Sequence, residues 1–324
     1  MTSAERHAAA RVWADRMHSI LGTPATAGNS VTVLRNGNEI FAAMLAAIDG
    51  AARSVDLVTF VYWNGHVADR FAMALAAAAH RGCRVRVLLD ALGGRKLDPD
   101  LLAVMTGAGC DVQWFRPLSD ERVPQLNRAN NRTHRKILVC DGEVGFIGGV
   151  GIADEWDGDA RNEDEYRDTH LAVRGPAVAD LQAGFLENWT AQNSDRLDPM
   201  AELVVAPPPV GESRCIVIRG VAETGSTEIW RMMLTLITCA TERIRIASAY
   251  FNPGVRLSDE LIAAVERGVS VDIMLPGEHA DKRFIQIAGE ASYGRLLDAG
   301  VTIRTYEVSM MHAKVMTVDG TVAS

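Results

Sequence analysis

The stretch THRKILVCDGEVGFIGG, residues 133–149, places a histidine, an arginine and a lysine at the start of an apolar run that is typical of a buried strand. A second stretch, MHAKVMTVDG at residues 311–320, has the same order. Burying cationic groups is unfavourable unless an anion meets them. In both stretches the histidine and the lysine are two residues apart, so on a strand their side chains point to one face. The sequence therefore predicts an anion-binding surface that is built twice.

Three polar positions recur when the two stretches are aligned. They pair His134 with His312, Lys136 with Lys314, and Asp141 with Asp319. An Asp-Gly pair follows each apolar run, where a hairpin is expected to turn. One such stretch alone would fit an edge strand with a solvated cationic face, but its recurrence at the same point of a repeat favours a shared site. Neither stretch has the spacing of metal ligands, so we expect no metal and no cofactor.

An internal repeat extends outward from these two stretches. Helical patterns and β-rich runs occur in corresponding pairs: 38–63 with 227–251, 72–90 with 261–276, and 101–115 with 295–307. Alternation of helix and strand favours an α/β fold. We expect a mostly parallel sheet flanked by helices in each half of the chain.

The repeat divides the chain into four parts. We expect an N-terminal amphipathic helix at 1–30, a first domain at 31–195, a Pro-rich linker at 196–213 and a second, incomplete domain at 214–324. Apolar residues of the N-terminal segment recur at helical spacing. This helix either packs on the body of the protein, which is the favoured interpretation, or lies on a membrane surface.

Bulk composition narrows the class of protein. The 324 residues carry a net charge of −8, which argues against an unspecific grip on nucleic acid, since that needs a basic face. The five cysteines are scattered without CxxC spacing, which favours reduced thiols and a cytoplasmic compartment. No apolar run reaches the length of about 18 residues that indicates a membrane-spanning helix, and the N-terminus lacks the apolar core of a signal peptide.

A longer pattern connects the first stretch to a known family. His-x-Lys, four residues, Asp, six residues and Gly runs complete from His134 through Lys136 and Asp141 to Gly148. It resembles the HKD motif of the phospholipase D superfamily. The surrounding segments NNRTHRKILVCDG, GFIGGVGIADEW and YRDTHLAVRGPAVADLQAGFLENW resemble bacterial cardiolipin synthases. The resemblance runs from about residue 31 to the end. It implies two phospholipase D-like domains related by a pseudo-twofold axis, with the active site at their interface.

The resemblance implies roles for the repeated residues. Lys136 and Lys314 neutralise the non-bridging oxygens of a phosphodiester as the transition state forms. His134 attacks phosphorus and gives a phosphohistidine, while His312 acts as acid and then as base; the reverse assignment stays open. The lysines supply the positive charge that a metal would supply. The two motif aspartates complete the catalytic set, and we expect them to fix the backbone at the turns without transferring protons.

Further residues are expected to support the site. By resemblance, Asp168 hydrogen-bonds His312 and sets its tautomer, although a strand-end surface aspartate is the plain alternative. Gly148 and Gly149 support the motif, and His170 is expected to be structural. Polar and aromatic residues that follow corresponding strands are candidates for substrate binding, because ligands of open α/β sheets bind beyond the carboxyl ends of strands; edge packing fits them equally well. These residues are Tyr62, Trp63, Asn64, Tyr250, Phe251 and Asn252.

Two departures from the family pattern stand out. The family places Asn two residues after the Gly pair, where this chain has Gly151, so a polar contact to phosphate is expected to be missing. The chain also ends at Ser324 within the second motif, which we interpret as C-terminal truncation. The acidic stretch at 154–168 is either a solvated loop or, beside the site, a barrier to polyanions.

The favoured function is a phosphatidyltransferase of the cardiolipin synthase kind. Its expected partners are a phospholipid such as phosphatidylglycerol, an alcohol or water as acceptor, and the membrane surface, with no specific nucleic acid. A monomer at the inner face of the cell membrane is expected. The alternatives are a hydrolytic phospholipase D, another phosphodiesterase including a nuclease, and a non-catalytic module that binds anionic lipid. The histidine–lysine machinery is the same for transfer and hydrolysis.

Overall fold

The computed structural model describes residues 3–117, 132–192, 204–220, 227–281 and 283–324. These residues form two compact units, each with one sheet. The eight-stranded unit comprises residues 26–158 and 169–224, and the five-stranded unit comprises residues 1–25, 159–168 and 225–324. The segment 159–168 therefore belongs to the five-stranded unit. Along the chain, however, it lies between two strands of the eight-stranded unit.

The eight-stranded unit holds one mixed sheet in the order β4-β3-β2-β5-β6-β7-β1-β8. Its strands are β1 (Thr26–Arg35), β2 (Ser54–Thr59), β3 (Arg84–Asp90), β4 (Asp111–Phe115), β5 (Ile137–Cys140), β6 (Val144–Gly148), β7 (Thr169–Arg174) and β8 (Ser213–Cys215). Its helices are α2 (Asn36–Asp49), α3 (His66–His80), α4 (Pro99–Gly107), the 3-10 helix η1 (Asp154–Trp156) and α6 (Ala177–Gln192).

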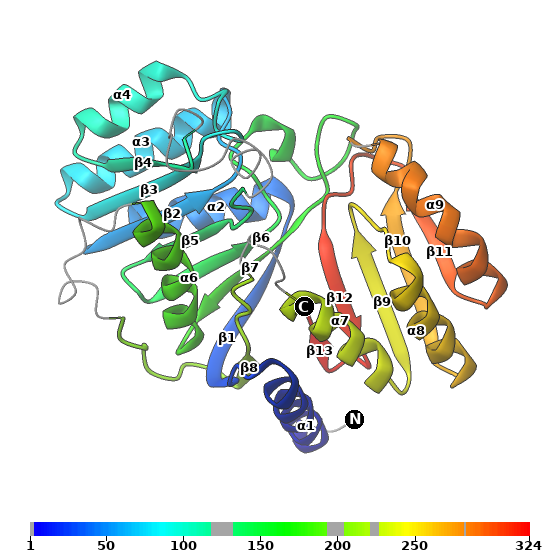
Figure 1. Ribbon diagram of the computed structural model, residues 1–324. Coiled ribbons are helices and arrows are strands. Elements are labelled where there is room, and N and C mark those ends of the chain that lie inside the picture. The colour runs from blue at the N-terminus through cyan, green and yellow to red at the C-terminus, as the bar shows by residue number, and fades with distance from the viewer. Residues whose placement is uncertain (1–2, 118–131, 193–203, 221–226, 282) are drawn as a thin grey trace. The chain divides into compact units, whose positions relative to one another are not determined.

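Helices cover both faces of this sheet (Figure 1). Helix α6 packs on one face, where its apolar residues meet alternate residues of the strands. Helices α2, α3 and α4 contact one another in sequence and lie on the other face. The core beneath α6 consists of Val58, Leu88, Phe115, Ile137, Val139, Val173, Ala177, Val178, Leu181, Phe185 and Trp189.

The five-stranded unit holds a sheet in the order β11-β10-β9-β12-β13. Its elements are α1 (Ser3–Leu21), α7 (Glu228–Cys239), β9 (Arg243–Ser248), α8 (Gly254–Glu266), β10 (Ser270–Pro276), α9 (Arg283–Asp298), β11 (Thr302–Tyr306), β12 (Lys314–Val318) and β13 (Val322–Ala323). The order repeats the path β4-β3-β2-β5-β6 of the other sheet strand for strand, which is the structural form of the sequence repeat.

The expected α/β fold with two sheets flanked by helices is confirmed, but the expectation of mostly parallel sheets is wrong. Strands β2, β3 and β4 pair in parallel, as do β9, β10 and β11. Strands β5 and β12 instead run antiparallel to β2 and β9, and each turns back in a hairpin. A parallel pair needs a long crossover connection. The short Asp-Gly turns after β5 and β12 can only connect antiparallel neighbours.

The N-terminal helix packs on the five-stranded unit. It ends at Leu21 and contacts α7, and its side chains of Trp13 and Met17 are buried. Residues 26–30, which were expected within the same helical segment, lie in β1. Residues 196–203 of the expected linker lie outside the described residues, and the expected domain boundaries stay a prediction.

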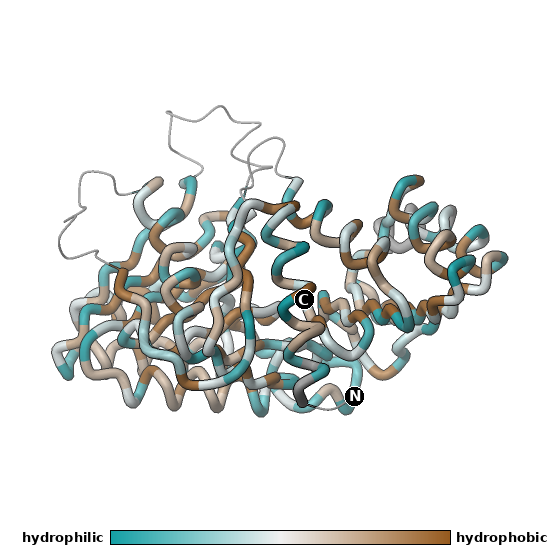
Figure 2. The backbone as a smooth tube through the Cα atoms, turned by 90° about the horizontal axis from the view of Figure 1, so that it is seen from below, coloured by the Kyte–Doolittle hydropathy of each residue, from teal (hydrophilic) through white to brown (hydrophobic). Residues whose placement is uncertain are grey.

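Apolar residues occur in short runs along the tube of Figure 2, separated by polar ones. Among the residues that the structure describes, no helix is both long enough and apolar enough to cross a membrane.

Candidate active site

The first motif enters the sheet as an extended segment before β5. All four residues of β5 are buried, which fixes the strand and the alternation of the side chains before it. Arg135 points toward α6, where it donates to the carbonyl oxygen of Gly184 at 2.6 Å and pairs with Glu187 at 2.8 Å. The side chains of His134 and Lys136, the residues on either side of Arg135, therefore point to the opposite face, as the spacing predicts.

His134 is exposed and stacks on an aromatic ring. Its imidazole lies 4.2 Å from the ring of Phe60, centroid to centroid, at an interplanar angle of 20°. The ammonium of Lys136 lies 5.8 Å from the centroid of the same ring and donates to the carbonyl oxygen of His134 at 3.2 Å. Phe60 follows β2 directly. The sequence analysis did not single it out, because a stacking partner is determined by tertiary structure.

Asp141 anchors the turn that follows β5. Its carboxylate accepts hydrogen bonds from the backbone N–H groups of Ala52, Arg53 and Ser54 at 2.7–2.9 Å. Its own backbone has φ of +56°, a conformation that Asp tolerates in turns. Burial raises the pKa of Asp141, but the three N–H groups and the charge of Arg53 outweigh burial and hold that pKa below its usual value.

Asp319 occupies the same position in the second motif. Its φ is +52°, and it accepts from the N–H groups of Thr241, Glu242 and Arg243 at 2.8–2.9 Å. Burial raises its pKa, and these bonds together with the Thr241 hydroxyl lower it below the usual value. Both motif aspartates therefore hold a turn against the start of the neighbouring strand. That neither of them transfers protons stays a prediction.

His312 forms the hydrogen bond that was expected with Asp168. The imidazole Nδ1 lies 2.8 Å from a carboxylate oxygen of Asp168, whose side chain is fully buried, while the His312 side chain is 13% exposed. With a proton on Nδ1 facing the carboxylate, Nε2 carries the lone pair. The ammonium of Lys314 lies 2.9 Å from this Nε2 and 3.0 Å from Nδ1, and it donates to the carbonyl oxygen of His312 at 2.6 Å.

A short ladder brings Asp168 to this histidine. The N–H of Arg167 donates to the carbonyl oxygen of Met310 at 2.9 Å, and the N–H of His312 donates to the carbonyl oxygen of Arg167 at 2.7 Å. Arg167 and Met311 form a parallel bridge. The segment 159–168 thus pairs with the backbone before β12, and this pairing sets the carboxylate beside the ring.

Two tyrosines surround the His312 ring. Tyr250 approaches it edge-on at 6.0 Å between centroids, and Tyr166 lies tilted at 6.3 Å. The hydroxyl of Tyr250 donates to the carboxylate of Asp281 at 2.9 Å, and the ammonium of Lys314 lies 5.3 Å from the Tyr250 centroid. Burial, followed by the negative charge of Asp281, raises the pKa of Tyr250 well above its usual value, so the phenol stays protonated.

The remaining substrate-binding candidates divide by burial. Tyr62 is fully buried and its hydroxyl donates to the carbonyl oxygen of Ala68, and Phe251 is 6% exposed. Both belong to the core, which argues against their expected contact with substrate. Asn64 and Asn252 are exposed. That they contact substrate stays a prediction.

Trp63 is partly exposed and fixed in place. Its indole N–H donates to the carbonyl oxygen of Gly93 at 2.8 Å, and the ammonium of Lys96 lies 3.9 Å from the ring centroid. A cation above an indole face is a favourable contact. Trp63 remains a candidate for substrate contact.

Two glycines in and after the first motif, Gly148 and Gly151, are closely packed. A Cβ on Gly148 would lie 2.3 Å from Nδ1 of His170, a buried histidine of β7. A Cβ on Gly151 would lie 2.6 Å from the Cβ of Val61. At Gly151, where the family pattern has Asn, a side chain therefore fits only if Val61 shifts. The supporting role predicted for Gly148 and Gly149 stays a prediction.

Much of the acidic stretch at 154–168 serves local structure. The carboxylate of Asp154 accepts from the first N–H groups of α3, those of His66 and Val67. Glu165 accepts from the N–H groups of Asp159 and Arg161, and these bonds lower the pKa of Glu165 to about 2. No group of three or more His, Cys, Asp or Glu side chains within the described part of the chain is placed to hold a metal ion.

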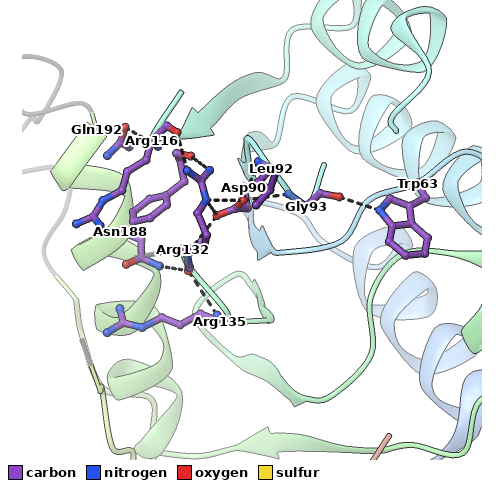
Figure 3. Close-up of polar contacts among 11 residues, drawn as sticks. Trp63, Asp90, Leu92, Gly93, Arg116, Arg132, Arg135, Asn188 and Gln192 are labelled. Atoms are coloured by element: carbon purple, nitrogen blue, oxygen red, sulfur yellow. Dashed lines mark hydrogen bonds and ion pairs between the residues drawn. The ribbon is translucent and has the colours of Figure 1, made fainter. Parts of the chain in front are cut away.

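A network around a buried carboxylate was missed by the sequence analysis. Asp90, at the end of β3, binds Arg132, which lies two residues before His134 (Figure 3). An aspartate directly after an apolar strand was the available signal, but its partner lies 42 residues away in the sequence.

Comparison with known proteins identifies the family. The family model described as "Cardiolipin synthase, PLD-like domain" matches residues 44–165 and 233–324. A cardiolipin synthase of Geobacillus kaustophilus is 34% identical over 305 residues, which covers 93% of this chain and 60% of that protein. One from Listeria monocytogenes is 30% identical over 305 residues, covering 94% of this chain and 62% of that protein. The chain thus spans about 60% of the length of the curated relatives it matches.

Solved structures share the fold. The crystal structure of phosphatidylserine synthase from Haemophilus influenzae matches with a TM-score of 0.65 at 12% identity, covering 95% of this chain and 80% of that one. Polyphosphate kinase from Porphyromonas gingivalis matches with a TM-score of 0.53 at 14% identity, covering 90% of this chain and 44% of that one. Since the family model matches more than half of the chain and the curated relatives align with nearly all of it, the chain belongs to the cardiolipin synthase family with the phospholipase D-like domain.

Proposed function

We propose that the protein is a phosphatidyltransferase that moves a phosphatidyl group from one phospholipid to an alcohol through a phosphohistidine. The observation that carries this proposal is the duplicated His-x-Lys stretch, together with the buried carboxylate on Nδ1 of His312. The cardiolipin synthase names of the relatives support cardiolipin as the product, and we propose phosphatidylglycerol as the phospholipid.

The first half-reaction forms the covalent intermediate. A ring nitrogen of His134 attacks phosphorus, and the bond from phosphorus to the departing alcohol breaks. His312 in its protonated form gives that alcohol its proton, and Asp168 stabilises the imidazolium before the proton leaves. The two motif lysines neutralise the charge that builds on the non-bridging oxygens.

The second half-reaction reverses these roles. His312, now neutral, takes the proton of the acceptor alcohol, whose oxygen attacks the phosphohistidine and releases His134. With the glycerol hydroxyl of a second phosphatidylglycerol as acceptor, the product is cardiolipin; with water, it is phosphatidic acid. The mechanism requires both histidines to act on one phosphorus in the same catalytic cycle.

The surroundings fit a lipid better than a nucleic acid. The net charge of −8 opposes a polyanion, and no cofactor is needed for the steps above. We propose a monomer that acts at the inner face of the cell membrane, where its substrate lies. A hydrolytic phospholipase D is the second candidate, because His134 is exposed and water could serve as acceptor.

Product analysis tests the proposal. The purified protein is incubated in detergent micelles with phosphatidylglycerol labelled in its glycerol backbone, with and without added glycerol or ethanol. Cardiolipin, and phosphatidylethanol when ethanol is present, are the expected products. Phosphatidic acid alone under every condition would identify a hydrolase. Binding of the lipid without any product would favour the non-catalytic alternative.

A further inference from the structure

The carboxylate of Asp90 lies at the centre of a fully buried network. Asp90 ends β3 and has no exposed surface. One of its oxygens accepts from the N–H groups of Leu92 and Gly93 at 2.9 and 3.0 Å. The guanidinium Nε of Arg132 lies 2.9 and 3.0 Å from the two oxygens, and the N–H of Thr133 donates to the second oxygen at 3.2 Å. The carboxylate thus binds the backbone that leads directly into His134.

Arg132 extends this network to a third strand. Its other nitrogens donate to the carbonyl oxygens of Phe115 and Arg116 at 2.8 and 3.0 Å, where β4 ends. The hydroxyl of Thr133 accepts from the side-chain amide of Asn188, on α6, at 2.7 Å. Figure 3 shows Arg132 between Asp90 on one side and Arg116 on the other.

The same carboxylate also holds the other side of His134. Gly93, whose N–H it binds, lies directly against Phe60. A Cβ on Gly93 would be 2.0 Å from the Phe60 carbonyl oxygen, so only glycine allows this approach. Phe60 in turn stacks on the His134 imidazole. Asp90 therefore fixes both the main chain that carries His134 and the ring against which its side chain lies.

The second half of the chain builds the same sheet without this pair. Asp90 lies opposite Phe115 on the neighbouring strand. At the corresponding point of the five-stranded sheet, Pro276 lies opposite Tyr306. Met310 stands two residues before His312, where Arg132 stands before His134. The fold accordingly tolerates Pro and Met at these positions. A buried ion pair is often no more stabilising than apolar residues of similar volume, so stability alone does not account for it.

We propose that the Asp90–Arg132 pair is a positioning device for His134, which sets the imidazole for attack on phosphorus. The expected effect on phosphohistidine formation rests on the proposed function. The expected effect on the position of His134 rests only on the contacts above. Asp90 touches neither substrate nor the reacting atoms in this mechanism, so it is a positioning residue. Displacing a reacting group by about 1 Å can slow a reaction by about 100-fold.

A second buried ion pair in the same sheet provides a matched control. Asp56 and Arg86 pair at 2.6 Å between β2 and β3, with side chains 1% and 5% exposed. Gln182 also donates to Asp56 at 2.6 Å. This pair lies within the strands and contacts neither His134 nor Phe60 in the contacts described above. Removing it therefore reproduces the loss of a buried ion pair without disturbing the motif.

The experiment compares Asp90→Asn, Arg132→Met and their double variant with Asp56→Asn, Arg86→Met and their double variant. Asp90→Asn keeps an acceptor for Leu92 and Gly93 but loses the charge that holds Arg132. Each double variant removes both charges and so avoids an uncompensated buried ion. Two quantities are measured: the rate of phosphohistidine formation from phosphatidylglycerol, and the rate at which diethyl pyrocarbonate modifies each histidine, by peptide mass spectrometry.

The proposal predicts a specific result for the Asp90→Asn/Arg132→Met variant. Phosphohistidine formation falls about 100-fold, with lipid binding unchanged, and only His134 among the eight histidines changes its modification rate severalfold. The Asp56→Asn/Arg86→Met variant keeps both rates. A folded Asp90→Asn/Arg132→Met variant with wild-type rates would overturn the proposal. So would loss of folding in this double variant alone, since the pair would then be structural.

Failure of the proposed function is distinguishable from failure of this inference. If the wild-type protein forms no phosphohistidine, the proposed function is wrong, and the modification rates alone decide the positioning role. A change confined to His134 would then still support it, and unchanged reactivity of His134 would contradict it.

Discussion

The hydrogen bond between Asp168 and His312 determines which ring nitrogen can serve as acid. Nδ1 faces the carboxylate at 2.8 Å, so in the proposed mechanism Nε2 gives the departing alcohol its proton. We expect Asp168→Asn to slow transfer from phosphatidylglycerol about 100-fold. A substrate analogue with an activated leaving group needs no acid, and its cleavage should change little. Equal losses for both substrates would show that Asp168 supports the fold and not the proton transfer.

The anchoring aspartates make a prediction about pH. The pKa of Asp141 is held below its usual value in the folded protein, so the ionised form stabilises the fold above the unfolded-state pKa of about 3.9. That stabilisation is lost as pH falls through the folded pKa. We expect Asp141→Asn to destabilise the protein most at neutral pH, with the difference from wild type shrinking below about pH 4. Urea unfolding at several pH values checks this, and a difference that is constant down to pH 2 would contradict it.

Gly151 gives a steric prediction. Replacing it with the Asn of the family pattern puts a Cβ 2.6 Å from the Cβ of Val61, and overpacking of this kind costs about 1–3 kcal/mol. We expect Gly151→Asn to lower the free energy of unfolding by this amount, and Val61→Gly in the same chain to recover part of it. An unchanged stability of the single variant would show that the backbone at 151 relaxes freely.

Sequence reasoning at the residue scale succeeded where local spacing carries the information. The His-x-Lys spacing placed His134 and Lys136 on one face, and the Asp-Gly turns were found at Asp141 and Asp319. The ring partner Phe60 and the Asp90–Arg132 pair were not found, because each depends on which distant segments the fold brings together. The burial of Tyr62 was not foreseen, because a strand end, seen in sequence, does not reveal burial.

At the scale of elements, the helix–strand alternation predicted the first three strands of each repeat and their helices correctly. It did not predict the antiparallel part, because β5 and β12 follow β4 and β11 without a helix in the pattern. The hairpin signal was present in the Asp-Gly pairs and determines the direction of the returning strands. A sheet with parallel and antiparallel parts therefore follows from reading both signals together.

At one corresponding position in the two sheets, neighbouring strands carry residues of opposite charge, and the acidic and basic residues are swapped between the strands. Asp56 on β2 pairs in register with Arg86 on β3, and Arg245 on β9 pairs in register with Asp272 on β10. The first pair is buried beneath α6, whereas Arg245 is exposed.

Burial decides what each pair contributes. Breaking a buried ion pair costs about 3–5 kcal/mol, whereas opposite charges on neighbouring strands at a solvent-exposed position contribute about 0.2–1 kcal/mol. We expect Asp56→Asn to weaken amide-exchange protection of β3 by that larger amount, and Asp272→Asn to leave β10 nearly unchanged. Hydrogen exchange measures the amide protection of each sheet separately. A similar loss of protection in both sheets would contradict the expected difference between the buried and the exposed position.

At the scale of the whole molecule, the repeat supplies two His-x-Lys sites, each complete with its own anchoring aspartate, in two compact units. The segment 159–168 belongs to the five-stranded unit and brings Asp168 to His312, although it connects strands of the other unit. A carboxylate from one half of the sequence thus orients the histidine of the other half.

Mapping the covalent intermediate would identify the residue that attacks phosphorus. The protein is mixed with phosphatidylglycerol, stopped within milliseconds at alkaline pH, where phosphohistidine survives, and digested for mass spectrometry. We expect a phosphatidyl adduct on His134, absent from His134→Ala and still formed by His312→Ala when the leaving group is activated. An adduct on His312 would reverse the two roles. Turnover of phosphatidylglycerol without an adduct on either histidine would contradict the account.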